Sequence, residues 1–283
     1  MATLQVIPFL LATVVPSSEA TNSSVFTFNV SIHIKHDEVM NKLNTPYDNT
    51  LFIIVVCESS LFPNLDCFIE KVEFNYKKDF PNDDFVVPFI TYKRTQFVIT
   101  LDMYKVQCYI DMQESPNKSF LRDICEMVGD QLNIGTDIVT PKGNYFTAME
   151  NSAIGKCLTF YQVYYRPGYV SNNFLEHVRT FHILGNKDFK LIPHHTLHVS
   201  KYRYMDSCSP PHDYMLGKMF RPYYIPNYYV SKLDKSHSRM SFTMHSFTSM
   251  TERTFEIRNS LKEVAGVIHE RITLELASVE EKT

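Results

Sequence analysis

The feature that most constrains this chain is a strict alternation of apolar and polar side chains in its first half. Between residues 26 and 34 every even position is apolar and every odd position is polar. Successive side chains of a strand point to opposite faces, so this pattern predicts a strand with one buried and one solvated face. Residues 51–57 (LFIIVVC) are nearly uniformly apolar and predict a central strand, and residues 72–76 alternate again. Residues 96–112 predict a hairpin with a tight connection at Asp102-Met103.

Two segments have the spacing of helices instead. Residues 119–132 place apolar side chains three and four apart, with Ser119 as the candidate N-cap. Residues 251–283 carry a longer stripe at the same spacing, preceded by a capping-box pattern at residues 249–252. The stripe consists of Ile257, Leu261, Val264, Ile268, Ile272 and Leu276. We therefore expect a β-rich α+β fold: an antiparallel sheet core, as a sandwich or two β-subdomains, with a long amphipathic C-terminal helix packed on it.

The expected organisation has three parts. Residues 1–20 are a candidate signal peptide, residues 21–250 a β-rich domain with a candidate subdivision near 115–118, and residues 251–283 the C-terminal helix. Within the domain, further strands are expected at 136–139 and 157–165, and a short helix at 173–181. Four prolines interrupt residues 206–226, which predicts a long ordered loop.

The N-terminal segment bears on the compartment. Residues 4–15 form an apolar run of the length of a signal-peptide core, and Ser18 and Ala20 are small residues suited to cleavage after Ala20. No basic residue precedes the run and Pro8 interrupts it, so the alternative is a buried strand of a cytoplasmic protein. No run of about 18 apolar residues occurs, so no transmembrane helix is expected.

Cysteines and glycosylation patterns favour a secreted or luminal protein. The six cysteines are even in number and form no C-x-x-C pair, which predicts three disulfides in an oxidising compartment; free buried thiols are the alternative. The disulfide candidates are Cys57, Cys67, Cys108, Cys125, Cys157 and Cys208. Asn22, Asn29 and Asn117 each begin an N-x-S glycosylation acceptor.

One histidine-rich segment is a candidate for chemistry. In LIPHHTLHVS (residues 191–200), His194, Thr196 and His198 lie on the same face of a predicted strand. Imidazoles beside hydroxyls can transfer protons or hold phosphate, although a solvated polar sheet face is the structural alternative. Positions four apart on a strand are separated by about 13 Å, which is too far for two histidines to share a zinc ion. No metal site is predicted.

The piece Pro193-His194-His195-Thr196-Leu197 resembles one of the two H-x-[TS]-hydrophobic motifs of the 2H phosphoesterases. In that family one histidine acts as base and the other as acid, so the resemblance implies a metal-independent phosphodiesterase or nuclease-like enzyme. The chain departs from the family pattern because the second motif is missing. His198 lies on the same strand as His194, and the residues after His245 have a different spacing.

A basic aromatic stretch at residues 201–239 is the candidate ligand-binding region. The simplest interpretation is a tyrosine-lined loop packed over the sheet. Among binding functions, tyrosines bury area at low entropic cost, so contact with a protein or glycan partner ranks ahead of nucleic acid. The candidate residues are Tyr202, Arg203, Tyr204, Arg221, Tyr223 and Tyr224. Cations interleaved with aromatics could also bind nucleic acid, although a net charge of -3 argues against coating it. A β core with a C-terminal helix resembles plant-virus movement proteins in plan, which keeps an intracellular nucleic-acid-binding protein as an alternative.

Motifs for nucleotide and redox chemistry are missing. The sequence contains no P-loop, no G-x-G-x-x-G turn, no G-x-S-x-G elbow and no H-E-x-x-H, so no cofactor is expected. The sequence as a whole favours a secreted or luminal β-rich binding glycoprotein without catalytic activity.

Overall fold

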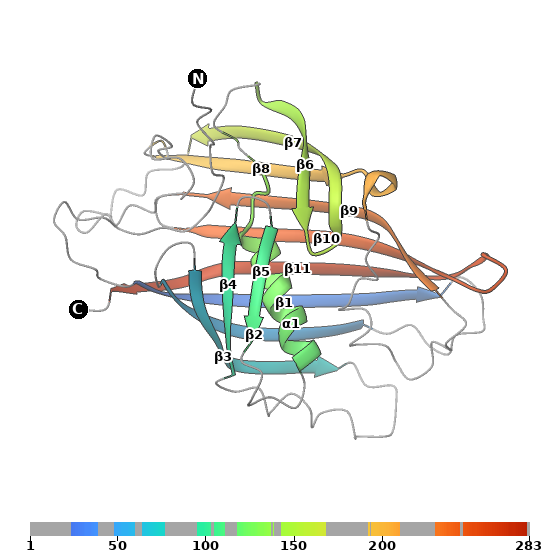
Figure 1. Ribbon diagram of the computed structural model, residues 1–283, viewed down its shortest axis with the longest axis horizontal. Helices are drawn as coiled ribbons and strands as arrows, with labels where there is room; N and C mark the ends of the chain where they lie inside the picture. Colours follow the sequence, from blue (N-terminus) through green and yellow to red (C-terminus); the bar gives the residue numbers. More distant parts are fainter. Residues whose placement is uncertain are drawn as a thin grey trace.

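The structure is a computed structural model that describes most of the chain from residue 24 onward (Figure 1). The described ranges are 24–38, 48–59, 64–76, 95–102, 105–110, 118–136, 138, 143–167, 192, 194–209, 230–243 and 246–281. The elements are β1 (Ser24–Glu38), β2 (Asp48–Ser59), β3 (Asn64–Tyr76), β4 (Gln96–Asp102), β5 (Lys105–Ile110), α1 (Lys118–Leu132), β6 (Tyr145–Ser152), β7 (Gly155–Pro167), β8 (His195–Arg203), β9 (Val230–Phe242), β10 (Phe247–Arg258) and β11 (Val264–Glu281).

All eleven strands belong to one antiparallel sheet in the order β5-β4-β3-β2-β1-β11-β10-β9-β8-β7-β6. Neighbours in the sheet are neighbours in the chain except at one place, where the last strand pairs with the first. That β1–β11 ladder runs from Ser24↔Glu281 to Glu38↔Gly266. It joins the two halves of the chain and leaves β5 and β6 as the edges. α1, which lies between these two strands in sequence, contacts β4 and β5 as well as β10 and β11 (Figure 1).

The core lies on the inner face of the sheet, around α1. Alternate side chains of β1 and β2 are buried, and the apolar face of α1 is fully covered. The fully buried residues of the helix are Leu121, Ile124, Cys125, Val128 and Leu132. Complete burial of a side chain of this size contributes about 1.5–3 kcal/mol to the stability of the fold. The packing of α1 therefore stabilises the sheet against which it lies. Gly129 allows the closest approach, because a Cβ at this position would overlap the side chain of Val106 on β5.

Three disulfides pair all six cysteines, as the even count predicted. Cys57–Cys67 joins β2 to β3, Cys108–Cys125 joins β5 to α1, and Cys157–Cys208 joins β7 to the chain after β8. Such bonds persist in oxidising environments such as the extracellular space or the secretory lumen. In the described part of the chain, no helix combines the length and the apolar character needed to cross a membrane.

The predicted α+β fold with a long C-terminal helix is wrong. Residues 251–283 contribute most of β10 and the whole of β11, and the capping-box residues 249–252 lie inside β10. In β11, side chains four apart share a face, so Ile268 and Ile272 fit a strand as well as a helix. Glu270, between them, also faces the core and is 2% exposed. A helix would have turned this carboxylate away from the stripe.

Other expectations are confirmed in part. Strands occur at 26–34, 51–57, 72–76 and 157–165, the hairpin is β4–β5, and the first predicted helix is α1. α1 begins at Lys118, so Ser119 lies inside its first turn and is not the N-cap. Thr136 and Ile138 are not in a strand. Residues 1–20, 115–117, 173–181 and 210–226 lie outside the described residues, and residues 205–207 form a 3-10 turn.

Candidate functional site

The predicted histidine strand exists as β8, and its two faces differ sharply. Leu197 and Val199, followed by Lys201 and Arg203, point to the inner face and are buried. The even-numbered residues between them point to the outer face, as the two-residue period of a strand requires. Thr196 and His198 therefore lie on the same face of β8, and the sequence alone left open which face is buried.

The candidate catalytic residues lie on or beside the outer face. His194 precedes β8 in a left-handed conformation with φ 60° and is exposed. The His198 ring stacks on Tyr164 at 5.0 Å between centroids, and its Nδ1 lies 3.3 Å from Ser241 Oγ. Burial, assisted by the nearby Arg166, lowers the pKa of His198, so this imidazole is neutral at pH 7. Among the described residues no group of three His, Cys, Asp or Glu side chains is placed to hold a metal ion.

The outer face of β6, β7 and β8 carries a concentration of exposed apolar side chains, which we call the aromatic patch. It consists of the exposed Tyr145, Met149, Leu158, Tyr202 and, directly after β8, Tyr204, together with the partly buried Phe160. Five of the ten exposed large hydrophobic residues in the described chain belong to it. Contiguous exposed apolar surface on a soluble protein marks a binding site more often than scattered residues do.

The rings of the patch form a continuous row across four strands. Tyr145 and Phe160 have centroids 6.2 Å apart, Phe160 and Tyr202 are also 6.2 Å apart, and Tyr202 stacks on His237 of β9 at 4.0 Å. Burial, with a contribution from Arg239, lowers the pKa of His237. The end of the row is therefore uncharged at neutral pH.

Exposed cations lie on the same face around this row. Lys156 and Arg166 are on β7, and Lys235 and Arg239 are on β9. The Arg166 guanidinium lies 5.0 Å from the centre of the Tyr164 ring. A hollow of about 490 Å³ adjoins the patch at Tyr204 and is also lined by Lys232, Asp206 and Asp234. The face thus combines an apolar aromatic centre with exposed cations on β7 and β9.

On the inner face, beneath the patch, lies a buried ionic cluster. Glu150 of β6 is 1% exposed and accepts hydrogen bonds from Lys201 Nζ at 2.9 Å, Arg203 Nε at 2.7 Å and Arg203 Nη2 at 2.8 Å. Burial alone would raise the pKa of Glu150, but the charges of Arg203 and Lys201 outweigh it and hold the pKa at about 2. Lys201 Nζ also donates to the Asn133 carbonyl at 2.7 Å. The edge strand β6 is therefore fixed to β8 through a fully buried charge.

The cluster continues into the helix and the next strands. The Ala153 amide donates to both oxygens of Asp130, and Arg253 bridges Asp130 and Glu270 at 3.4 and 3.3 Å. Burial raises the pKa of Asp130 in spite of the opposing charges of Arg253 and Arg203. Gln131 joins α1 to β10, where it donates to Thr251. These contacts keep the strands under the patch in a fixed arrangement.

The structure separates the predicted ligand-binding residues. Tyr202 and Tyr204 lie on the aromatic patch, whereas Arg203 points inward to Glu150. Arg221, Tyr223 and Tyr224 lie outside the described residues. Sequence reasoning missed Tyr145, Met149, Leu158 and Phe160, which come from β6 and β7. The signal was present in residues 157–165 (CLTFYQVYY), where both faces of a strand are largely apolar although β7 lies next to a sheet edge.

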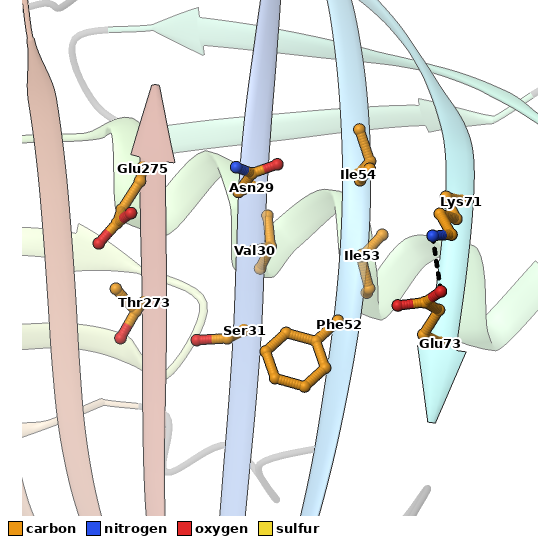
Figure 2. A pocket seen from close by; sticks show the side chains of 10 residues that line it. All are labelled: Asn29, Val30, Ser31, Phe52, Ile53, Ile54, Lys71, Glu73, Thr273 and Glu275. Atoms are coloured by element: carbon orange, nitrogen blue, oxygen red, sulfur yellow. Dashed lines mark ion pairs between the residues drawn. The ribbon is translucent and has the colours of Figure 1, made fainter. Parts of the chain in front are cut away.

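A second surface feature is a groove of about 340 Å³ on the outer face of β11, β1, β2 and β3 (Figure 2). The candidate glycosylation residue Asn29 lies in it and is exposed. Asn22 and Asn117 lie outside the described residues.

Comparison with known proteins gives a likeness of fold. No protein-family model and no curated protein sequence matches the chain. A solved structure, titled "Lipid-protein interactions in lipovitellin", superposes with a TM-score of 0.58 over 91% of this chain at 13% sequence identity. The fold resembles part of lipovitellin. This chain spans 25% of the length of that lipovitellin chain, and at this identity the likeness concerns the fold alone.

Proposed function

We propose that this chain is a non-catalytic binding protein of the extracellular space or secretory lumen, and that it associates with lipid surfaces through the aromatic patch. Three observations support the proposal. The disulfides suit an oxidising compartment. The fold resembles part of lipovitellin, whose structure was reported for its interactions with lipid. The aromatic patch supplies exposed apolar surface where the sheet reaches its β6 edge.

The aromatic patch carries the proposal. Tyrosine has an apolar ring and a polar hydroxyl, so it suits the boundary between lipid headgroups and acyl chains. Met149 and Leu158 offer purely apolar surface beside these rings. Exposed cations such as Lys156 and Arg239 lie on the same face and would attract anionic headgroups. A surface of this composition fits a lipid monolayer or bilayer from outside.

The described interior favours an external mode of binding. Leu121, Ile124 and Val128 of α1 fill the space on the inner face and are fully buried. Lipid associated with this part of the chain would therefore contact the outer face of the sheet. The buried Glu150 cluster keeps that face rigid, which lowers the entropic cost of binding.

Vesicle flotation tests the proposal. The full chain, secreted from eukaryotic cells, would be mixed with phosphatidylcholine vesicles, alone or with phosphatidylserine, and the fraction that floats measured. Complete burial of a large apolar side chain contributes about 1.5–3 kcal/mol. Tyr202 and Tyr204 are each roughly half exposed, so Tyr202→Ser with Tyr204→Ser is expected to weaken partitioning roughly tenfold to a hundredfold.

The matched control is Tyr109→Ser, because Tyr109 is exposed on β5 at the opposite edge of the sheet. This variant should float like the wild type. Stronger binding to vesicles that contain phosphatidylserine, reduced by salt, is expected from the cations around the patch. Absence of flotation of the wild type on both vesicles would refute lipid association and leave the expectation of a protein or glycan partner. Equal flotation of the double variant would place the lipid elsewhere.

A further inference from the structure

The groove of Figure 2 lies on the outer face, separated from the aromatic patch by the intervening strands β10 and β9. Its floor carries the small side chains of Ser31 and Thr273, and Lys71 and Glu73 form an ion pair of 2.6 Å at its β3 side. Polar groups and one large aromatic ring, Phe52, surround this floor. The groove therefore offers both an apolar platform and hydrogen-bonding groups within a small area.

Asn29 stands in this groove as the first residue of the acceptor Asn29-Val30-Ser31. Asn29 and Ser31 are two apart on β1, so both side chains point outward, whereas Val30 points inward and is 2% exposed. No described residue forms a hydrogen bond with the Asn29 side-chain amide. The nitrogen that would carry a sugar is therefore accessible in the folded protein.

Phe52 is the unusual neighbour of this asparagine. It lies directly opposite Ser31 in the β1–β2 ladder, while Asn29 lies opposite Ile54. Phe52 and Asn29 are thus diagonal neighbours, a relation that separates residues by about 7–8 Å and leaves them within reach of a large group. The ring is 41% exposed, and its other cross-strand partner is the charged Glu73. The described neighbours leave a large apolar face uncovered.

We propose that Asn29 carries an N-linked glycan whose first sugar lies in this groove against Phe52. The apolar C–H face of a sugar ring matches the uncovered phenyl ring, and sugar hydroxyls can pair with Thr273 and Glu275. In the transfer step, Asn29 Nδ2 forms a bond to the anomeric carbon of a lipid-linked oligosaccharyl diphosphate. The bond from that carbon to the diphosphate breaks, the lipid diphosphate leaves, and Nδ2 loses a proton. The inference rests on the compartment part of the proposed function and not on lipid binding.

The glycan would account for two features at once. It would cover the exposed Phe52 ring, and it would occupy the outer face of β11, β1 and β2 so that the aromatic patch is the open apolar surface of the molecule. Glycan attachment and lipid association would then use different parts of the same sheet face.

The test uses a form with a single acceptor. Asn22→Gln with Asn117→Gln leaves Asn29 as the remaining acceptor, and a heterologous signal sequence directs the full chain into the secretory pathway. Intact mass before and after treatment with peptide-N-glycosidase should show one glycan, with conversion of Asn29 to aspartate. Transfer occurs during synthesis, so protein retained in the cell reports occupancy even where secretion fails. Unmodified Asn29 in both the secreted and the retained protein would overturn the proposal.

The position of the sugar is tested by a double-mutant cycle. Phe52→Ser and the control Tyr109→Ser are each melted with the glycan present and after its removal. The glycan is expected to raise the melting temperature by roughly 2–4 °C in the wild type and in the control, and by much less in Phe52→Ser. An equal glycan effect in Phe52→Ser would show that the sugar does not rest on Phe52. Loss of vesicle flotation with Asn29 occupied would defeat lipid association alone.

Discussion

The substitution Glu150→Gln tests how much the buried ionic cluster contributes to stability. It preserves the shape of the side chain but removes the charge that faces Lys201 and Arg203. The pKa of Glu150 is lowered from 4.5 to about 2 in the folded state, which corresponds to about 3 kcal/mol of stability. Independently of the pKa, removal of one partner from a buried ion pair generally lowers the free energy of unfolding by about 3–5 kcal/mol. We therefore expect a loss of about 3–5 kcal/mol, against a total of about 5–15 kcal/mol for a typical domain.

Urea unfolding followed by circular dichroism measures this difference. At pH 7 the midpoint should fall with little change in slope, because the same surface is exposed on unfolding. A lowered folded-state pKa means that the stabilisation by Glu150 is complete above about pH 4.5 and is lost as the pH falls through about 2. The gap between the wild type and Glu150→Gln should therefore close between these two pH values.

The matched control is Glu252→Gln. Glu252 pairs with Arg271 on the outer face, where both side chains are partly exposed, and an exposed pair contributes at most about 1 kcal/mol. A loss below about 1 kcal/mol for Glu150→Gln at pH 7 would refute the reasoning. So would a gap that stays constant from pH 5 to pH 2.

Three further predictions concern the packing at Gly129, the disulfide of Cys157 and the buried carboxyl group of Asp130. Gly129→Ala should destabilise by about 1–3 kcal/mol because its Cβ overlaps Val106, and Val106→Ala in the same chain should restore most of the loss in denaturant unfolding. Replacement of Cys157 and Cys208 by serine removes a disulfide between residues 51 apart and should lower the free energy of unfolding by about 4 kcal/mol. In the wild type, a thiol reagent should find no reactive cysteine in denatured, unreduced protein. Burial raises the pKa of Asp130, so the charged form opposes folding and the wild type should gain stability relative to Asp130→Asn as the pH is lowered from 7 through that raised pKa. A constant difference across this pH range would contradict the assignment.

Local sequence patterns predicted a helix or strand correctly where the apolar residues fitted the period of that element alone. Between residues 26 and 34 of β1 every inward position is apolar and every outward position polar, so the sequence alone predicted this strand and its buried face. α1 was also predicted from the sequence, because its apolar residues have the spacing of a helix and no two-residue period. The number of disulfides, three, was also predictable from the six cysteines. The partner of each cysteine was not, because pairing depends on which strands meet.

Local patterns failed where the deciding partner lies far away in the chain. Ile268 and Ile272 are four apart, a spacing that places two side chains on one face of either a strand or a helix. What fixes β11 as a strand is its position between β1 and β10, together with the burial of Glu270 against Arg253. No local period can anticipate a buried carboxylate whose cation comes from another strand.

The candidate site shows the same division. The sequence by itself grouped Tyr202, Arg203 and Tyr204 as one set of candidate binding residues, whereas the strand β8 turns Arg203 to the opposite face from Tyr202. Only the tertiary structure decided which face is covered. On the inner side of β8, Lys201 contacts the Asn133 carbonyl just after α1, and Arg203 contacts Glu150 of β6. On the outer side, the pairing of β6, β7 and β8 joins rings from three strands into one exposed surface. Long-range pairing therefore joined tyrosines that are far apart in the sequence into one exposed aromatic patch.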